Sequence, residues 1–82
     1  MSSTSTFDKN EPQYKMSDEF ARCLMAELKK HNIKFSQFCD IVGVNKYYLR
    51  KVVDRNVQMS CYLSLLETIA EMANIKNIKL YK

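Results

Sequence analysis

The chain is poor in the residues on which catalysis and metal binding depend. Its 82 residues include a single histidine, His31, a single proline, Pro12, and a single glycine, Gly43. A lone histidine without a paired-cysteine motif offers no set of zinc ligands, so no metal site is expected. His31 also has no partner nucleophile, and no carboxylate pair or phosphate-binding loop accompanies it. We therefore expect no enzymatic activity and no cofactor.

Cysteine is scarce and irregularly placed. Cys23, Cys39 and Cys61 are odd in number and form no Cys-x-x-Cys motif, which indicates reduced core cysteines rather than a disulfide framework. No apolar run approaches the ~20 residues that a membrane helix needs. The N-terminus lacks the charged-then-hydrophobic order of a secretion signal. The expected location is the cytoplasm, without a membrane partner.

Apolar residues for a core and a surplus of cations are what the chain does have. Hydrophobic residues make up 46% of the sequence and the formal net charge is +4, which indicates one small globular domain. The cations are concentrated in residues 29–55, where seven Lys and Arg against two Asp give a net charge of +5. The preceding helical segment has a net charge of −2, from Asp18, Glu19, Arg22 and Glu27. A local positive field favours a polyanionic ligand, although basic surfaces that are merely solvated are common.

The glycine lies between two short segments with helical spacing of apolar residues. The first predicts a helix whose apolar face comprises Phe35, Phe38, Cys39 and Val42. After Gly43, the side chain of Asn45 can cap a second helix. The expected inward residues of that second helix are Tyr48, Leu49, Val52 and Val53. Its outward face is basic and carries Lys46, Tyr47, Arg50, Lys51 and Asp54. Two short helices around a tight turn, with cations on the second, indicate a DNA-binding helix-turn-helix.

A set of positions in and after this turn carries a family resemblance: Cys39, Gly43-Val44-Asn45, Leu49 and Val52, then Leu66, Ile69 and Ala70. At these positions the chain resembles the lambda-repressor-like, or Cro/XRE-type, helix-turn-helix family. Phe35 stands where a glutamine often opens the first helix of the pair, which is a departure from the family pattern. The resemblance implies an all-α fold, a small domain of four to five helices.

Three regions are expected along the chain. Residues 1–16, polar and rich in serine and threonine, are expected to form a flexible N-terminal tail. Residues 17–75 are expected to form the helix-turn-helix domain. Residues 76–82 are expected to be an extension, either a short strand or a frayed continuation, whose exposed edge invites pairing with another subunit.

Two longer helices complete the predicted domain. The first is expected from about Asp18 to His31, capped by Ser17, with a buried stripe of Phe20, Ala21, Leu24, Met25 and Leu28. His31 and the lysines before it complement the negative end of that helix. The last helix is expected from about Ser60 to Ala73, with Leu63, Leu66, Ile69, Ala70 and Ala73 facing inward.

The resemblance implies sequence-specific binding of double-stranded DNA as a small transcriptional regulator, with residues 46–54 in the major groove. Base contacts are expected from Lys46, Tyr47 and Lys51, with Arg50 adjacent. Arg55 and Asn56 are candidates for phosphate contact. Asn45, Ser36 and Gln37 complete the set of candidate DNA-binding residues.

The expected assembly is a homodimer, because one short helix reads only a few base pairs and this family usually pairs two half-sites. The suspected subunit contact comprises Val57, Met59, Ile78 and Leu80. A rival hypothesis is a protein-interaction module on the same fold, such as a phage-encoded inhibitor or an antitoxin. RNA binding is a third, less favoured because the sequence lacks an aromatic signature for stacked bases.

Overall fold

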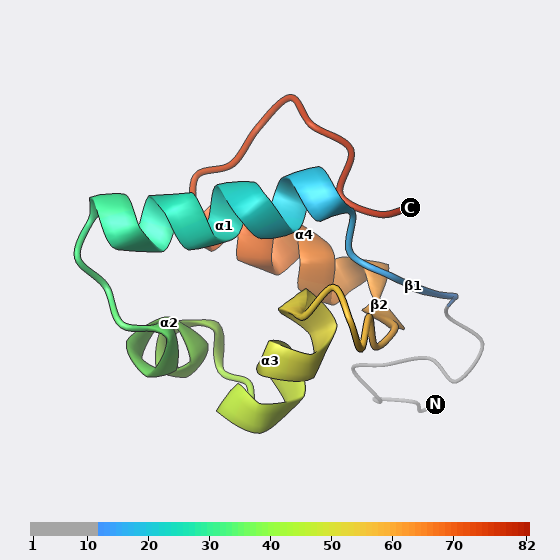
Figure 1. Cartoon of the computed structure of the whole chain (residues 1–82), viewed down its shortest axis with the longest axis horizontal. Coiled ribbons are helices and arrows are strands. Elements are labelled where there is room, and N and C mark those ends of the chain that lie inside the picture. Colours follow the sequence, from blue (N-terminus) through green and yellow to red (C-terminus); the bar gives the residue numbers. More distant parts are fainter. Residues whose placement is uncertain (1–11) are drawn as a thin grey trace, which may run out of the picture.

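The structure is a computed structural model that describes residues 12–82, in which four helices surround a core beside a two-stranded sheet (Figure 1). The helices are α1 (Asp18–Lys30), α2 (Phe35–Val42), α3 (Lys46–Val53) and α4 (Leu63–Met72). The strands are β1 (Gln13–Tyr14) and β2 (Cys61–Tyr62). The described part of the chain is therefore mostly helical, and the expectation of an all-α fold is wrong in one respect, the sheet.

Local capping chemistry explains the bounds of α1. The hydroxyl oxygen of Ser17 accepts a hydrogen bond from the backbone N–H of Phe20 at 3.0 Å, which satisfies one orphan donor of the first turn. Asn32, just past the helix, has a φ of 57° and so takes the left-handed conformation that ends a helix. The prediction that Met25 is a core residue of α1 is wrong, because its side chain is 45% exposed.

The core lies where the four helices meet. Its largest fully buried side chains come from every helix and from β2: Phe20, Leu24, Phe38, Leu49, Leu66 and Ile69, together with Val52, Cys39 and Cys61. Burial of such a side chain contributes on the order of 1.5–3 kcal/mol. Within this core α2 packs against both α3 and α4. The helix pair around Gly43 is therefore supported by α4 on its inner side.

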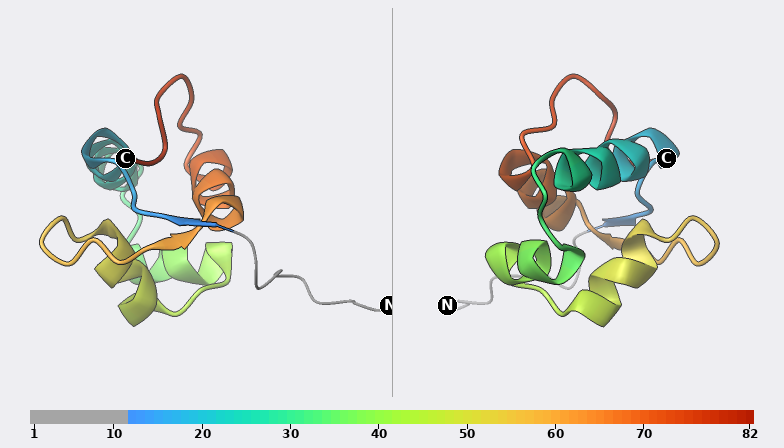
Figure 2. Two further views of the ribbon diagram at one scale, coloured as in Figure 1. Left: turned by 90° about the vertical axis from the view of Figure 1, so that its right-hand side faces the viewer. Right: turned by 60° about the vertical axis from the view of Figure 1, so that its left-hand side comes forward.

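The sheet corrects the predicted start of the last helix. Strands β1 and β2 pair in an antiparallel direction, with Gln13 opposite Tyr62 and Tyr14 opposite Cys61. Because Cys61 and Tyr62 are used in this pairing, α4 begins at Leu63 rather than near Ser60. Figure 1 shows both strands at one end of the helical body, and the left view of Figure 2 shows them side by side.

The last residues of the expected N-terminal tail belong to the folded domain. Residues 1–11 of that prediction lie outside the described residues. Gln13–Tyr14 are in β1, and Met16 is only 3% exposed in the core. The prediction of a tail that reaches residue 16 is therefore wrong for this stretch, because Met16 supplies an apolar side chain that the small core can bury.

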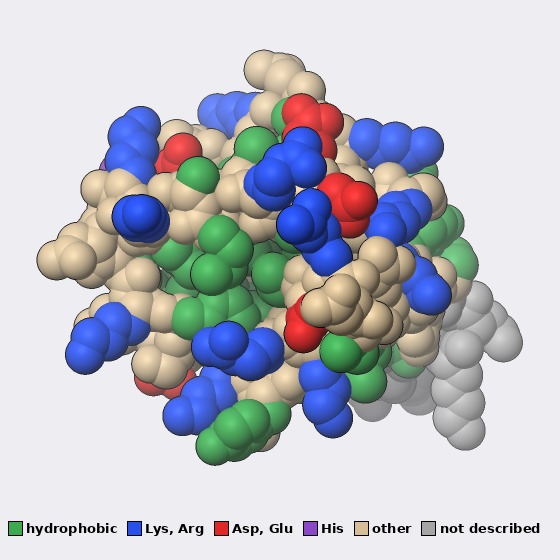
Figure 3. Space-filling view, in the orientation of Figure 1, with side chains coloured by type: hydrophobic (Ala, Val, Ile, Leu, Met, Phe, Trp, Pro, Cys, Tyr) green, Lys and Arg blue, Asp and Glu red, His purple; other side chains and the backbone are tan. Residues whose placement is uncertain are grey.

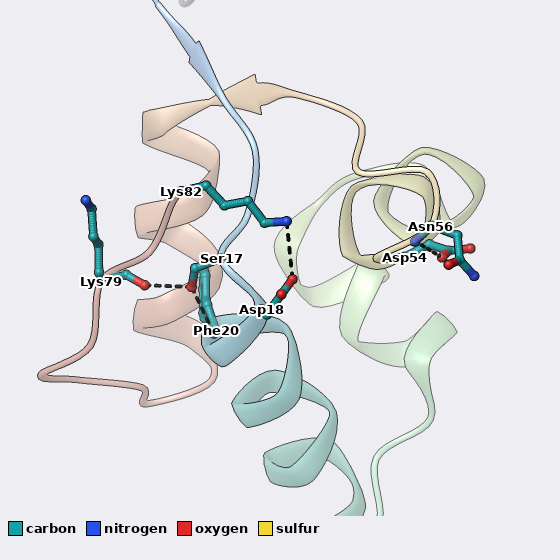
Figure 4. A network of polar contacts seen from close by, with 7 residues as sticks. All are labelled: Ser17, Asp18, Phe20, Asp54, Asn56, Lys79 and Lys82. Carbon is teal, nitrogen blue, oxygen red and sulfur yellow. Dashed lines mark hydrogen bonds and ion pairs between the residues drawn. The ribbon is translucent and has the colours of Figure 1, made fainter.

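The C-terminal segment pairs with this same stretch of its own chain. The backbone N–H of Ser17 donates to the carbonyl of Leu80 at 3.0 Å, and the N–H of Lys82 donates to the carbonyl of Lys15 at 3.0 Å. The Ser17 hydroxyl also donates to the carbonyl of Lys79 at 2.7 Å (Figure 4). Tyr81 and Met16 form an isolated antiparallel β-bridge. The edge that was expected to pair with another subunit is thus occupied within the chain.

The described helices include none that could cross a bilayer. No helix in residues 12–82 combines the required length with sufficient hydropathy.

Candidate nucleic-acid interface

The turn between α2 and α3 depends on the backbone conformation of Gly43. Gly43 has a φ of 89°, in the left-handed region that residues other than glycine rarely adopt. Its N–H donates to the carbonyl of Cys39 at 2.8 Å, and the N–H of Val44 donates to the same carbonyl at 3.0 Å. A β-carbon built on Gly43 would meet nothing within 4 Å. Glycine is therefore favoured here by the backbone conformation of the turn rather than by a lack of space for a side chain.

The start of α3 is fixed by Asn45. The amide oxygen of Asn45 accepts hydrogen bonds from the backbone N–H groups of Tyr47 at 2.8 Å and Tyr48 at 3.3 Å. The predicted cap is therefore confirmed. Asn45, itself a candidate DNA-binding residue, thus uses its amide oxygen to cap α3, the helix that carries Lys46, Tyr47, Arg50 and Lys51.

Burial of one face of α3 exposes the opposite face. Leu49 and Val52 lie in the core, while four candidate residues of the helix are exposed: Lys46, Tyr47, Arg50 and Lys51. Tyr47 is exposed to 68%, so its ring is open to contact from outside the molecule. The helix thus presents an aromatic ring and three cations to solvent.

Two of these cations lie against aromatic rings. The guanidinium carbon of Arg50 is 5.0 Å from the ring centre of Phe35, at the first residue of α2. The ammonium of Lys46 is 5.3 Å from the ring centre of Tyr47. Both distances are within the range of a cation–π attraction. Phe35 therefore supports a candidate side chain across the turn, a role that helical spacing cannot reveal because the contact joins two helices.

The starts of α2 and α3 share one open depression. It is lined by Phe35, Ser36, Lys46, Tyr47 and Arg50, so the structure brings four of the candidate residues together. Gln37 has a different role, because its side-chain oxygen accepts from the N–H of Lys34 at 2.9 Å and thereby caps α2.

A compact turn follows α3. The carboxylate of Asp54 accepts from the N–H of Asn56 at 2.8 Å (Figure 4), and the Asp54 carbonyl accepts from the N–H of Gln58 at 2.7 Å. The N–H of Met59 donates to the carbonyl of Lys51 at 3.1 Å. Gln58 has a φ of 51°, so this turn uses a left-handed residue although it contains no glycine. Asn56 is exposed on it.

Arg55 lies on this turn but away from the depression at the helix starts. It is exposed and lines a second depression together with Ala21, Arg22, Met25 and Val53. Sequence reasoning did not assign Arg22 to any site, because it belongs to a helical segment with a net negative charge. Only the packing of α1 over the end of α3 brings Arg22 and Arg55 to one place.

The candidate cations have no carboxylate partners among the described residues. The ion pairs in residues 12–82 join His31 to Glu27 and Lys82 to Asp18, each at 3.4 Å. Lys46, Arg50, Lys51 and Arg55 are therefore not neutralised locally, and their charges add to one positive field. Figure 3 shows Lys and Arg side chains spread over this face of the molecule.

The buried thiols of Cys39 and Cys61 are not activated for chemistry. All three cysteines are free. Cys39 and Cys61 are buried, as predicted for core residues, whereas Cys23 is only partly buried. Burial raises the pKa of the Cys39 thiol and raises that of Cys61 to about 11. Since the thiolate is the nucleophile and the metal ligand, neither thiol is activated for such chemistry at neutral pH. Residues 12–82 also contain no cluster of three His, Cys, Asp or Glu that could hold a metal ion.

Fold and site together define a small, mostly helical domain in which a short turn presents one basic, aromatic helix face. No protein-family model, curated protein or solved structure matches this chain.

Proposed function

We propose that this chain is a small cytoplasmic transcriptional regulator of the lambda-repressor-like type that binds double-stranded DNA sequence-specifically through α3. The observation that supports this most directly is the exposed face of α3, where Lys46, Tyr47, Arg50 and Lys51 lie together without carboxylate partners in the described chain. An α-helix fits the major groove of B-DNA, and clustered cations attract its phosphates.

The roles proposed for the side chains follow from their positions. Lys46, Tyr47 and Lys51 would contact base edges, and Arg50, held against Phe35, would donate to a guanine with little loss of side-chain entropy. Phosphate contacts would come from Ser36, at the start of α2, and from Arg55 and Asn56, after α3. Asn45 and Gln37 would act by fixing the helix starts.

The proposed assembly on DNA is a homodimer on two half-sites, about one helical turn apart. Of the four residues suspected at the subunit contact, Met59, Ile78 and Leu80 pack partly buried against the core of their own chain, while Val57 is 52% exposed. The apolar contact is therefore smaller than the sequence predicts. Sedimentation of the protein free and on its selected duplex tests the dimer, and a strictly monomeric mass in both conditions would exclude it.

The experiment that tests DNA binding has two stages. Selection from random duplexes by gel shift would identify a preferred site, and a salt titration would then compare it with a scrambled duplex. We expect preferential binding whose affinity falls as salt rises, because bound cations release counterions from the phosphates. Absent or salt-insensitive binding by the folded protein would reject the proposal.

A further inference from the structure

A hollow lies between α1 and the α2–α3 pair. Figure 3 shows it as an apolar floor with Lys and Arg side chains on both sides. It consists of two adjoining depressions that share Met25 and Val53. The first has a volume of about 170 Å³ and is also lined by Phe35, Arg50 and Asp54. The second, of about 450 Å³, is the one lined by Arg22 and Arg55.

The floor of this hollow is unusual for a solvated surface. Met25 projects from the middle of α1 with 45% of its surface exposed, beside the partly buried Phe35 and Val53. Leaving such side chains in water forgoes the stabilisation that their burial would give. Methionine is also flexible and polarisable, and it is common on surfaces that adapt to a partner.

The rim of the hollow is positively charged. Arg22 comes from α1, Arg50 from α3 and Arg55 from the turn after α3. Among the described residues of the lining, Asp54 supplies the one carboxylate. Three cations against one carboxylate give a net charge of +2 at this rim. None of the three arginines takes part in an ion pair within residues 12–82. Arginine is enriched at the energetic centres of protein interfaces because its planar group forms paired hydrogen bonds with carboxylates.

We propose that this hollow is the docking site for an acidic segment of a partner protein. An apolar anchor residue of that segment would cover Met25, Phe35 and Val53, and flanking carboxylates would pair with Arg22, Arg50 and Arg55. The apolar floor favours a protein over a nucleic acid, because phosphate binding needs the arginines but gains nothing from an exposed methionine. An amphipathic helix lying in an apolar groove is a recurrent form of such recognition.

One consequence rests on the proposed function. Arg50 lines both this hollow and the depression at the starts of α2 and α3. A carboxylate that pairs with Arg50 would withdraw it from DNA. The docked segment would therefore compete with DNA and act as a release signal for the regulator.

The direct test uses three labelled peptides and does not involve DNA. The first peptide carries two leucines one helical turn apart among glutamates. In the second peptide serines replace the leucines, and in the third lysines replace the glutamates. Binding is measured by fluorescence anisotropy, and the contact is mapped by amide chemical shifts of the 15N-labelled protein. We expect the first peptide alone to bind, with shifts centred on α1 and α3 around Met25 and Val53.

Matched variants locate the site. Met25→Gln should weaken the first peptide by at least about tenfold, whereas Met72→Gln, at a methionine of similar exposure on α4, should change it less than about twofold. Arg22→Gln combined with Arg55→Gln should also weaken it by at least about tenfold. Lys30→Gln combined with Lys76→Gln removes as much charge outside the lining and should have little effect. Thermal unfolding of each variant confirms that it is folded.

Three results would overturn the proposed docking site. No binding of the first peptide, or equal losses in the matched variants, would leave the hollow without a protein ligand. Equal binding of the serine peptide would show that only the anionic charge is recognised and that the apolar floor has no role in docking. A competition assay with the selected duplex keeps the two proposals distinguishable. Peptide binding without any DNA binding would support the docking site and reject the proposed function.

Discussion

At the scale of single residues, Gly43 and Asn45 determine how α3 is presented. The left-handed conformation of Gly43 reverses the chain, and the amide oxygen of Asn45 receives the first free N–H groups after the turn. These two residues make few core contacts, yet the orientation of the exposed face of α3 depends on both. Substitutions here should therefore affect the helix pair before they affect the core.

Gly43→Val should destabilise the protein by about 1–3 kcal/mol, because a β-branched residue reaches a φ of 89° only with backbone strain. The measurement is urea denaturation followed by circular dichroism. Gly43→Asn is the control and should cost less, since asparagine tolerates the left-handed region better than valine. Equal stability of Gly43→Val and the wild type would show that this φ is not required.

A second prediction at this scale concerns the buried thiol of Cys61, whose pKa is raised to about 11. In the unfolded chain the thiol loses its proton near pH ~8.5, so between these values the folded state retains a proton that the unfolded state has lost. Stability should therefore fall as pH rises through this window. Urea midpoints of the wild type and Cys61→Ala, measured at several alkaline pH values, test this. An equally steep decline in Cys61→Ala would assign the effect to other groups.

At the scale of elements, α3 is stabilised from one side and exposed on the other. Its inner residues Leu49 and Val52 are in the core, so changes on its outer face should leave stability nearly unchanged. The outer face and the following turn carry cations with different proposed roles. Those roles can be separated by how each substitution changes specificity and salt dependence.

Lys46→Ala should lower affinity for the selected duplex by about 1–3 kcal/mol while affecting a scrambled duplex much less, if Lys46 donates to a base edge. Arg55→Ala should weaken both complexes about equally and reduce the salt slope by about one unit, if Arg55 contacts phosphate. The measurement is a salt titration of both duplexes for three proteins of matched thermal stability. Identical behaviour of the two variants would contradict this division of roles.

At the scale of the whole molecule, the two ends of the described chain hold each other. Ser17 caps α1 and, through its N–H and its hydroxyl, also bonds the carbonyls of Leu80 and Lys79. The rings of Tyr14 and Tyr81 lie with centres 4.4 Å apart. The start of α1 is thus clamped by the C-terminal segment, which is part of the fold rather than an extension available to a second subunit.

Removal of residues 79–82 should therefore destabilise the monomer by about 3 kcal/mol or more. The truncation deletes three hydrogen bonds, each contributing about 1 kcal/mol, together with the apolar burial of Leu80 and Tyr81. Urea denaturation at several protein concentrations is the measurement. Lys82→Ala is the control, since it removes only a partly exposed ion pair with Asp18 and should cost less than about 1 kcal/mol. An unchanged midpoint of the truncated chain would show that the segment is not part of the stable fold.

Features set by neighbouring residues were predictable from the sequence. The bounds of α1 and α3, to within one residue, the caps at Ser17 and Asn45 and the tight turn at Gly43 agree with the structure. Each depends on side-chain spacing or on hydrogen bonds within one turn of helix, so the information lies within a few residues. The candidate residues of α3 were found exposed for the same reason, because the helix period fixes which side chains point away from the core.

Only the tertiary structure decided the contacts between distant segments. The pairing of Gln13–Tyr14 with Cys61–Tyr62 and the docking of Leu80 on Ser17 join residues more than forty positions apart, and such short extended pieces have no periodic pattern. The contact of Arg50 with Phe35 and the meeting of Arg22 with Arg55 arise because whole helices pack together. Met25 shows the limit most clearly. Its spacing on α1 is that of a core residue, but no other element of residues 12–82 covers that part of the helix. Burial depends on what packs opposite a side chain, and that is a property of the complete fold.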